Sequence, residues 1–301
     1  MNAVTTTDLK GLRLMNRGKV RDVYEVSDEH LLLVATDRIS AFDVVMPVPV
    51  PGKGIILTQL SLFWFELLKD ITGNHLVEAD VDAMPMAVRA HRDVLAGRSM
   101  LVRRAQVYPA ECIVRGFLLG SGWKDYQRSQ TVCGIPLPPG LKKNHRFDPA
   151  LFTPSTKAVV GHDENISFEV LAETVGQDLA SELKAKSLAT YHRAFAHAHD
   201  RGIIICDTKF EWGDIGGKVT LVDEVLTPDS SRFWKREDAE RHLPNGDPPS
   251  FDKQVVRDYL ETLTWDKKAP GPVIPDEVLS LARSRYIEIY ERIAGRKVPC
   301  L

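Results

Sequence analysis

The sequence has little that would place the chain at a membrane, on nucleic acid or outside the cell. Lys and Arg total 39 against 41 Asp and Glu in 301 residues, so the charge balance gives no argument for binding nucleic acid or an anionic membrane. The first ten residues hold no basic region followed by an apolar core, and we expect no secretory signal. The most apolar long stretch, 55–68, is interrupted by polar residues and is too short to cross a bilayer, which predicts an amphipathic helix.

Cysteine is equally sparse. The four cysteines, at positions 112, 133, 206 and 300, have neither the spacing of a metal site nor that of a paired framework. A reduced compartment is the default for such a chain, so we expect a cytoplasmic protein. The sequence also lacks internal repeats, low-complexity tracts, the P-loop pattern and the dinucleotide fingerprint. The common glycine-rich nucleotide sites are therefore not indicated.

Length and patterning predict two domains of an α+β protein. A single core rarely grows beyond about 250 residues, so a chain of 301 residues allows two cores. Short β runs at 19–26 and 30–36 predict a hairpin, and a proline-rich crossing then leads to a helix from about Thr58. A second β region follows at about 99–114. We place the domains at 1–108, a mostly antiparallel lobe, and 109–301, a larger α+β lobe.

The larger domain contains a long polar segment. From Gln130 to Ser167 the composition shifts to Pro, Gly, Asn, Lys and Asp, which predicts a long irregular binding loop or lid. Ser167 then caps a helical region that is interrupted near Gly176, and a longer helix ends at Gly202. Helices around 251–263 and 275–294 complete the expected elements.

The most informative segment is 204–213. Asp207, Lys209 and Glu211 are spaced by two within an apolar run, and because side chains alternate along a strand, the three charged groups would share one face. The glycines that follow predict a hairpin turn, and the returning strand would place Asp223 opposite Glu211. Two facing carboxylates repel each other unless a cation lies between them.

A magnesium ion would relieve this repulsion. Magnesium prefers carboxylate oxygens and leaves its other positions to water and substrate phosphates. Lys209 would then be a suitable point charge for a phosphoryl group. The alternative is a solvated hairpin face on which acidic and basic residues alternate for solubility.

Two motifs near the N-terminus could contact phosphate or substrate. Gly18 begins the first hairpin and permits a close backbone approach to a phosphate, whose oxygens Lys19 and Arg21 could bind from one strand face. Residues 36–43 place Ser40 and Asp43 in a polar turn. The alternatives are a surface hairpin for the first motif and an ordinary turn for the second.

Two further motifs surround the central segment. Glu111 and Arg115 lie on an apolar strand, where they are costly to bury unless they bind a ligand or each other. Ser121 follows between two glycines that offer exposed backbone amides. Asp229 and Arg232 lie in a tight turn after the carboxylate hairpin, and arginine is suited to hold a phosphate or carboxylate there.

In this order the segments resemble the SAICAR synthetase (phosphoribosylaminoimidazole-succinocarboxamide synthase) family of de novo purine synthesis, from Gly18 to about Trp234. The signature positions are Pro109, Glu111, Arg115, Gly120 and Ser121 in one block, Asp207, Lys209, Glu211 and Gly213 in a second, and 223–234 in a third. Two departures occur. Trp212 stands where the family usually has phenylalanine, and the loop 157–167 is shorter than the family's and lacks an acid.

The resemblance implies an ATP-dependent ligase that joins the carboxylate of carboxyaminoimidazole ribotide to the amine of L-aspartate, with release of ADP and phosphate. It implies a kinase-like antiparallel N-terminal lobe and a larger α+β C-terminal lobe with the ATP cleft between them. The expected partners are these three small molecules and Mg²⁺, with no nucleic acid and no membrane. We expect a monomer or a small homo-oligomer.

The resemblance also implies a role for each matching residue. Gly18, Lys19, Arg21, Glu111 and Lys209 would bind ATP, and Glu211 and Asp223 would hold magnesium. Asp207 and Lys209 would lie beside the transferring phosphoryl group as catalytic residues. The ribotide and its phosphate would face Ser40, Asp43, Arg115, Ser121, Asp229 and Arg232.

The residues by themselves also allow two other functions. A small-molecule kinase would use the same lysine, glycine hairpin and paired carboxylates. The arginines at 115 and 232 favour a ligase, which must bind two further anionic substrates. A nucleotide-binding regulatory protein without turnover is the third possibility, and the presence of both carboxylates and Lys209 argues against it.

Overall fold

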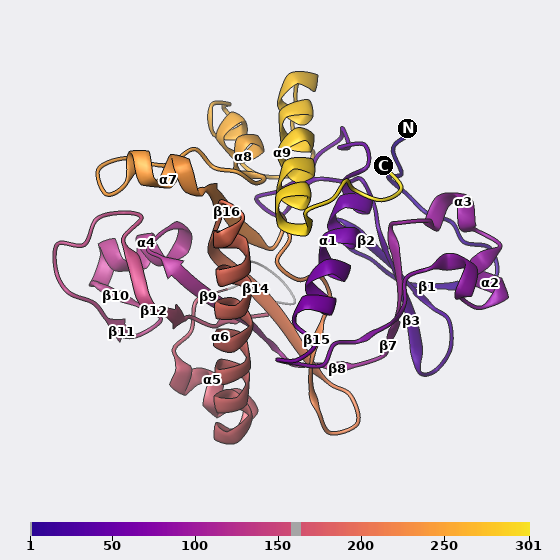
Figure 1. Ribbon diagram of the computed structural model, residues 1–301, viewed down its shortest axis with the longest axis horizontal. Helices are drawn as coiled ribbons and strands as arrows, with labels where there is room; N and C mark the ends of the chain where they lie inside the picture. The colour runs from indigo at the N-terminus through magenta and orange to yellow at the C-terminus, as the bar shows by residue number, and fades with distance from the viewer. Residues whose placement is uncertain (1, 158–163) are drawn as a thin grey trace.

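The computed structural model describes residues 2–157 and 164–301, and its main elements are two antiparallel β-sheets with helices packed against them (Figure 1). The first sheet has the strand order β1-β2-β3-β7-β6. Its strands are β1 (Arg13–Arg17), β2 (Arg21–Glu25), β3 (His30–Ala35), β6 (Leu76–Glu78) and β7 (Ser99–Arg103). The predicted N-terminal hairpin is confirmed, since β2 pairs with β3 and Arg21 lies opposite Ala35.

One long helix accompanies this sheet. Helix α1 (Lys53–Leu67) begins before Thr58, because Gly52 takes a φ of 79° and turns the chain into the helix directly after the prolines. The residues from Lys53 to Thr58 are buried without interruption, so α1 is a core helix and the predicted amphipathic character is wrong. The short elements nearby are β4 (Ser40–Ala41), β5 (Val44–Val45), η1 (Val81–Ala83), α2 (Met86–Arg89) and α3 (Arg92–Leu95).

The second sheet is centred on β9 (Ala110–Phe117) and β14 (Ile203–Asp214). These two strands pair antiparallel, with Asp207 opposite Arg115 and Lys209 opposite Ile113. The other strands are β8 (Gln106–Val107), β12 (Arg146–Phe152), β13 (Ser155–Thr156), β15 (Val219–Val222) and β16 (Ser231–Lys235). The longest strand, β14, therefore has neighbours on both edges, and its side chains are fixed from both sides.

The helices of the larger lobe are α4 (Gly120–Ser129), α5 (Phe168–Val175), α6 (Gln177–Asp200), α7 (Arg236–His242), α8 (Gln254–Glu261) and α9 (Asp276–Ala294). The predicted cap is confirmed, since the Ser167 side chain accepts a hydrogen bond from Val170 N at the start of α5. The predicted break is also confirmed, because Gly176, with a φ of 91°, separates α5 from α6. Helix α6 packs on β14 and β9 and covers one face of the second sheet (Figure 1).

The prediction of an irregular segment from Gln130 to Ser167 is wrong for its described residues. The segment contributes β12 and β13 to the second sheet and also forms a small hairpin of β10 (Thr131–Val132) and β11 (Ile135–Pro136). Phe147 and Phe152 are buried. Asp148 and Pro149 interrupt the apolar residues between these two anchors, so the segment gives no periodic signal in the sequence. Residues 158–163, within the loop for which a family departure was noted, lie outside the described residues.

The main hydrophobic core joins the two predicted domains. Leu60 and Trp64 of α1 belong to the same buried cluster as Phe210 and Trp212 of β14. Trp64 also donates from Nε1 to the carbonyl oxygen of Leu226 at 3.1 Å. Burial of such large side chains is a major stabilising contribution, so the two sheets are held together by more than a linker. The boundary at residue 108 itself stays a prediction.

None of the helices in residues 2–157 and 164–301 combines the length and the apolar character needed to cross a bilayer.

Candidate active site

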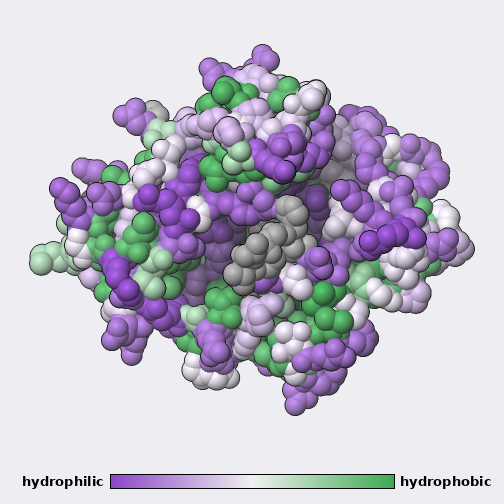
Figure 2. All heavy atoms as spheres, turned by 180° about the vertical axis from the view of Figure 1, so that it is seen from behind, coloured by the Kyte–Doolittle hydropathy of each residue, from purple (hydrophilic) through white to green (hydrophobic). Residues whose placement is uncertain are grey.

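A large cavity of about 1610 Å³ is lined by residues of both sheets and of α4 and α8. Seen from behind, the molecule is hollowed at the middle of its face, and the side chains around the hollow are mostly hydrophilic (Figure 2). Of the sequence-predicted site residues, those lining the cavity are Gly18, Lys19, Arg21, Ser40, Asp43, Glu111, Ser121, Lys209, Glu211, Asp223, Asp229 and Arg232. Arg115 and Asp207 lie behind this lining and contact Arg232 or Ser121.

One wall of the cavity is apolar. It is lined by Val23, Leu33 and Val102 of the first sheet and by Val107 of β8 and Val222 of β15 in the second. Such a wall suits a flat heteroaromatic base. This wall was not predicted from the sequence, because strand alternation alone does not say which face of the first sheet meets the cavity.

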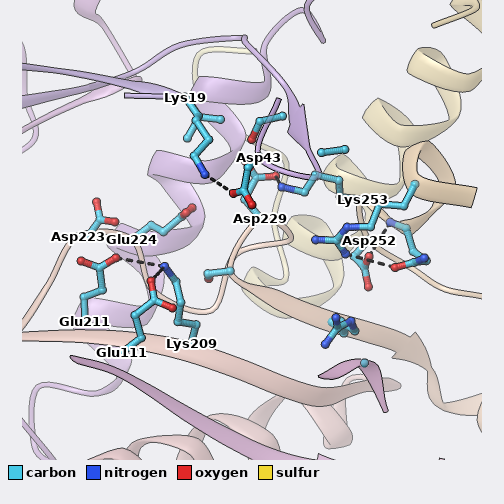
Figure 3. Close-up of a pocket in the computed structure, with 18 of the residues that line it drawn as sticks. Lys19, Asp43, Glu111, Lys209, Glu211, Asp223, Glu224, Asp229, Asp252 and Lys253 are labelled. Carbon is cyan, nitrogen blue, oxygen red and sulfur yellow. Dashed lines mark hydrogen bonds and ion pairs between the residues drawn. The ribbon is translucent and has the colours of Figure 1, made fainter. Parts of the chain in front are cut away.

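Strand β14 presents its charged residues as the spacing of two predicted. Lys209 and Glu211 face the cavity, whereas Phe210 and Trp212 are fully buried in the main core on the other face. The neighbouring strand β9 brings Glu111 to the same place. Lys209 Nζ contacts Glu111 and lies 3.2 Å from Glu211 Oε1, so one lysine bridges two carboxylates (Figure 3).

Ion pairing keeps these groups charged. Burial alone would raise the pKa of Glu211, but Lys209 and Lys157 beside it lower that pKa to about 2. Burial would likewise lower the pKa of Lys209, and Glu211 and Glu111 raise it above its usual value instead. Lys157 donates to Glu211 Oε2 from the start of the loop after β13. At neutral pH Glu211 is therefore a carboxylate between two ammonium groups.

Asp223 does not lie opposite Glu211, and that prediction is wrong by one residue. The turn between β14 and β15 has four residues, 215–218, so the ladder pairs Glu211 with Val222. Asp223 comes directly after the strand, with a φ of 63°. Its carboxylate accepts a hydrogen bond from Arg21 Nη2 at 2.5 Å.

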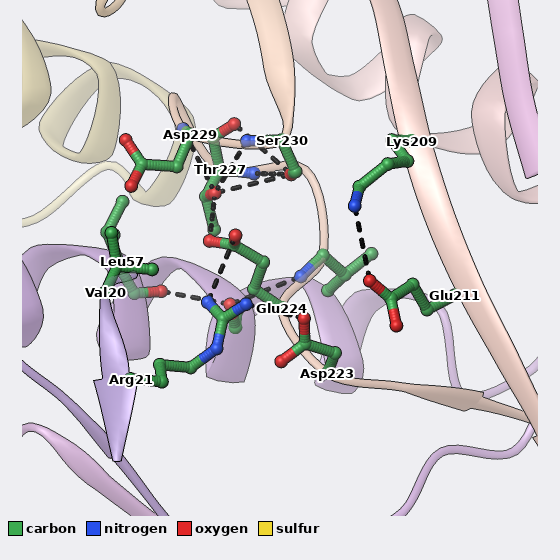
Figure 4. Close-up of polar contacts among 12 residues, drawn as sticks. Val20, Arg21, Leu57, Lys209, Glu211, Asp223, Glu224, Thr227, Asp229 and Ser230 are labelled. Atoms are coloured by element: carbon green, nitrogen blue, oxygen red, sulfur yellow. Dashed lines mark hydrogen bonds and ion pairs between the residues drawn. The ribbon is translucent and has the colours of Figure 1, made fainter. Parts of the chain in front are cut away.

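The repulsion expected between carboxylates is nevertheless present at Asp223. Burial raises the pKa of this carboxyl to about 6; Arg21 opposes the rise, and Glu211 and Glu224 add to it. Arg21 also lies 3.0 Å from Glu224 Oε1, so one guanidinium balances two acids (Figure 4). A further cation at this place would be stabilising.

The N-terminal motifs reach the same cavity. Gly18 lies in the turn before β2, and its N–H donates to the Arg21 carbonyl at 2.8 Å. Lys19 forms an ion pair with Asp43 across the cavity rim. Ser40, on β4, is half-buried. The ion pair of Lys19 with Asp43 thus joins a residue predicted to bind ATP to one predicted to bind the ribotide.

Asp207 is held between two arginines. Its Oδ2 lies 3.1 Å from Arg115 Nη1 and 2.5 Å from Arg232 Nη1, and Asp207 is only 4% exposed. Arg115 also donates to Ser121 Oγ at 2.8 Å. Arg115 therefore has Asp207 as its acidic partner, and the alternative of a pair with Glu111 is wrong. The pairing of β9 with β14 places Arg115 opposite Asp207.

Asp229 forms ion pairs with two buried lysines. Its Oδ2 lies 2.6 Å from Nζ of Lys53, which is 0% exposed, and its Oδ1 lies 3.5 Å from Nζ of Lys253. Tyr286 of α9 donates to Oδ1 at 2.9 Å. Burial would raise the pKa of Asp229, but the two lysines hold it well below its usual range.

Neither lysine was predicted from the sequence as a site residue. Lys53 begins an apolar run and Lys253 begins a helix, and a lysine in either position is ordinarily read as solvent-exposed. The only signal was their contrast with apolar neighbours, such as Ile55 and Phe251.

The cavity therefore has two ends of different charge. In the part of the chain that the structure describes, the acidic end consists of Glu111, Glu211, Asp223 and Glu224 with Lys157, Lys209 and Arg21. The basic end consists of Arg115, Arg232, Lys53, Lys253 and Arg257 with Asp207, Asp229 and Asp252. Figure 3 shows Lys253 and Asp252 of the basic end on one side of the view and Asp229 nearer the middle, with the labelled members of the acidic end on the other side.

Comparisons with known proteins point to one family. Residues 14–272 match the family model described as SAICAR synthetase. A phosphoribosylaminoimidazole-succinocarboxamide synthase of Syntrophobacter fumaroxidans is 53% identical over 293 residues, which cover 97% of this chain and 96% of that protein. The corresponding protein of Pelobacter propionicus is also 53% identical, with 97% and 98% covered.

Solved structures give the same result. The SAICAR synthase of Saccharomyces cerevisiae, complexed with SAICAR, superposes with a TM-score of 0.89 at 43% identity, covering 98% of this chain and 99% of that one. A SAICAR synthetase in complex with ADP superposes with a TM-score of 0.67 at 25% identity, covering 94% and 98%. With a family match over most of its length and relatives above half identity, the chain belongs to the SAICAR synthetase family.

Proposed function

We propose that this chain joins the carboxylate of carboxyaminoimidazole ribotide to the amine of L-aspartate, with conversion of ATP to ADP and phosphate. The observation that carries the proposal is the bridge from Lys209 to Glu111 and Glu211, next to Asp223, within a cavity of a SAICAR synthetase family member. The relatives solved with SAICAR and with ADP support a site for both kinds of molecule.

The residue types suit ligation through an acyl phosphate. A carboxylate is a poor acyl donor, because its leaving group is oxide. Transfer of the γ-phosphoryl group of ATP to the ribotide carboxylate replaces oxide by phosphate as the leaving group. The amine of L-aspartate then forms the C–N bond, phosphate departs, and the amine loses a proton. No serine or cysteine nucleophile is needed, and positioning with charge neutralisation supplies most of the catalysis.

Magnesium fits the acidic end. Glu211 and Asp223 offer hard oxygen ligands, and the raised pKa of Asp223, about 6, reflects burial and neighbouring acids that a cation would relieve. Residues 2–157 and 164–301 contain no group of three or more His, Cys, Asp or Glu side chains arranged to hold a metal by themselves. Glu211 and Asp223 would therefore share the magnesium ion with water and with ATP phosphates. When bound, the ion would neutralise part of the charge of these phosphates.

The cations around the acidic end would bind the ATP phosphates. Lys19 and Arg21 both line the cavity, Gly18 leaves room for backbone approach, and Lys209 lies between the carboxylates. In the structure Lys19 and Arg21 are paired with Asp43 and with Asp223 and Glu224. Binding of ATP with magnesium would exchange these acids for phosphate oxygens, so nucleotide and metal would bind together.

The ribotide phosphate would bind at Arg232 and Ser121. Arg232 lines the cavity, and its guanidinium is held by Asp207, which also holds Arg115. We infer that Asp207 acts through these arginines by fixing their direction. This role differs from direct contact with the transferring phosphoryl group, because Asp207 lies behind the cavity lining.

ADP release with and without each substrate tests the function. The purified chain with Mg²⁺ and ATP should release ADP at a high rate only when both the ribotide and L-aspartate are present, and the product should contain the succinyl group by mass spectrometry. A small-molecule kinase would release ADP with a phosphorylated product and no need for L-aspartate. Omission of Mg²⁺ by chelation should abolish turnover and tests the metal separately.

A further inference from the structure

The turn before β2 is held in place by an arginine behind the cavity wall. We propose that Arg38 is a positioning residue for the nucleotide, because it fixes the backbone of Gly18 and Lys19 in the shape that receives the ATP phosphates. Gly18 and Lys19 line the cavity, whereas Arg38 lies behind them and is not part of the lining. This inference rests on the proposed function, which assigns the ATP phosphates to this turn.

The guanidinium of Arg38 binds two neighbouring carbonyl groups of the turn. Its Nη2 donates to the Gly18 carbonyl at 2.9 Å, and its Nε donates to the Lys19 carbonyl at 3.1 Å. Thr36 binds the next carbonyl, that of Val20, from its N–H at 2.9 Å and from its hydroxyl at 2.8 Å. Three consecutive carbonyl groups are therefore bound from one neighbouring segment. A carbonyl oxygen carries partial negative charge, so engaging these oxygens behind the lining keeps them from repelling a phosphate.

Arg38 is itself fixed by a buried acid. Its side chain is only 12% exposed, and Nη2 also donates at 2.8 Å to Oδ1 of Asp22, whose side chain is fully buried. The N–H and the hydroxyl of Thr7 donate to the other oxygen of Asp22, at 3.2 and 2.6 Å, which fixes the direction of the carboxylate. Nη1 of Arg38 donates to the Thr5 carbonyl. The planar guanidinium can serve all these acceptors at once because its N–H donors point in fixed, different directions.

Only the backbone of Lys19 is restrained in this way. Its side chain is 53% exposed and pairs with Asp43, and an exposed ion pair contributes little stability. The Lys19 ammonium can therefore exchange Asp43 for a phosphate at small cost, while Arg38 holds the chain beneath it. A turn that is ordered before the ligand arrives loses less conformational entropy on binding, so Arg38 should act on nucleotide affinity.

Isothermal titration with ADP and Mg²⁺ tests this role without turnover. Arg38→Gln should weaken ADP binding about tenfold to a hundredfold, the range expected for loss of charged hydrogen bonds, and should leave binding of the ribotide within about twofold. In steady-state assays the KM for ATP should rise by a similar factor. The kcat at saturating ATP should stay within about threefold, because Lys209, Glu211 and Asp223 are unchanged. Arg38→Lys keeps the charge but not the planar fork, so it should bind ADP as weakly as Arg38→Gln.

Arg17→Gln is the matched control. Arg17 lies 3.4 Å from the same oxygen of Asp22 and donates to the Thr7 carbonyl at 2.7 Å, but its described contacts do not include the carbonyl groups of the turn. This variant should bind ADP within about twofold of the wild type. If it weakens ADP binding as much as Arg38→Gln does, the effect comes from Asp22 and the N-terminal segment, and the assignment is wrong.

A second variant keeps the test decisive if Arg38→Gln does not fold. Asp22→Asn combined with Arg38→Gln replaces the buried carboxylate together with its buried partner, so no uncompensated charge is left at this place. Unchanged ADP affinity in a folded variant without Arg38 would overturn the inference. Wild-type affinity in Arg38→Lys would also overturn it, because charge alone would then suffice. A wild-type protein that binds no ADP with Mg²⁺, or makes no succinyl product, would instead refute the proposed function.

Discussion

The acidic and basic ends of the cavity are built from different kinds of contact. At the acidic end, Lys209 and Glu211 are two residues apart on β14, and Glu111 comes from the strand paired with it. At the basic end, Asp229 brings together Lys53 of α1 and Lys253 beside α8. Strand alternation places Lys209 and Glu211 of the acidic end, whereas long-range packing brings together Lys53, Lys253 and Asp229 of the basic end. One part of a site can therefore be predicted from the sequence while another part cannot.

The largest effect should come from the acidic end. Glu211→Gln and Asp223→Asn should each lower kcat on the order of 10²–10³-fold, the range for removal of one preorganised charge-stabilising group. Each change removes a proposed magnesium ligand. ADP release measured over a range of Mg²⁺ concentrations checks this, with circular dichroism to show that the variants are folded. Near-wild-type release at ordinary Mg²⁺ in either variant would exclude the assigned role.

The next largest effect should show that the two ends of the cavity bind different substrates. Arg232→Ala should raise the KM for the ribotide about tenfold to a hundredfold, because a charged hydrogen bond to its phosphate is lost, and should leave the KM for ATP within about twofold. Varying each substrate at saturation of the others measures both values. If the ATP KM changes instead, Arg232 belongs with the acidic end and the division of the cavity is wrong.

Without metal, substitutions of Asp223 and Glu211 should change the stability of the protein in opposite directions. Asp223→Asn should raise the free energy of unfolding at pH 7 by about 1–3 kcal/mol, since the folded state pays to ionise a carboxyl whose pKa is about 6. Glu211→Gln should lower it by about 1–2 kcal/mol, because Lys157 and Lys209 lose their shared partner. Urea unfolding in EDTA checks both signs.

The pH dependence follows from the direction of each pKa shift. Asp223 has a folded pKa above its unfolded value, so its contribution to stability falls as pH rises from about 4 to about 6. The advantage of Asp223→Asn should be complete above pH 6 and absent below about pH 4. Glu211 has a lowered pKa, so its contribution is present above about pH 4 and is lost as pH falls toward 2. An Asp223→Asn advantage that is the same at pH 4 and pH 7 would contradict the assigned pKa.

The smallest effect should come from Ser121→Ala at the basic end. Ser121 accepts a hydrogen bond from Arg115, and its hydroxyl is one of the proposed phosphate contacts. Ser121 carries no charge of its own and Arg232 stays in place, so loss of the Ser121 hydroxyl should raise the ribotide KM only about two- to tenfold. Isothermal titration with the ribotide alone would check this, and a rise that equals the effect of Arg232→Ala would show that Ser121 does more than bind phosphate.

Local patterns predicted several elements correctly. The first hairpin, the cap at Ser167, the break at Gly176 and the alternation along β14 all follow from contacts within a few residues. The twelve predicted residues that line the cavity were found from charge placed on apolar or turn-forming segments and from family signatures. Their individual roles stay predictions.

The errors have a common physical origin. Strand β12 was missed because its hydrogen-bonding partner, β9, lies about 30 residues earlier and supplies the pairing that the sequence of β12 does not signal. The register at Asp223 was wrong by one residue because a three-residue turn and a four-residue turn fit the same glycines. Helix α1 was expected to be amphipathic, but it packs against both the first sheet and α9, which buries most of its residues.

The sequence by itself determined the charged face of β14 and the glycine turns around it, because side-chain alternation and positive φ are properties of neighbouring residues. It also carried the signatures of the SAICAR synthetase family. Only the tertiary structure decided that Lys53 and Lys253 share Asp229, that Asp207 holds two arginines, and that Asp223 is paired with Arg21. The reason is that the free energy of a buried charge depends on which partners the folded chain brings within a few ångströms of it.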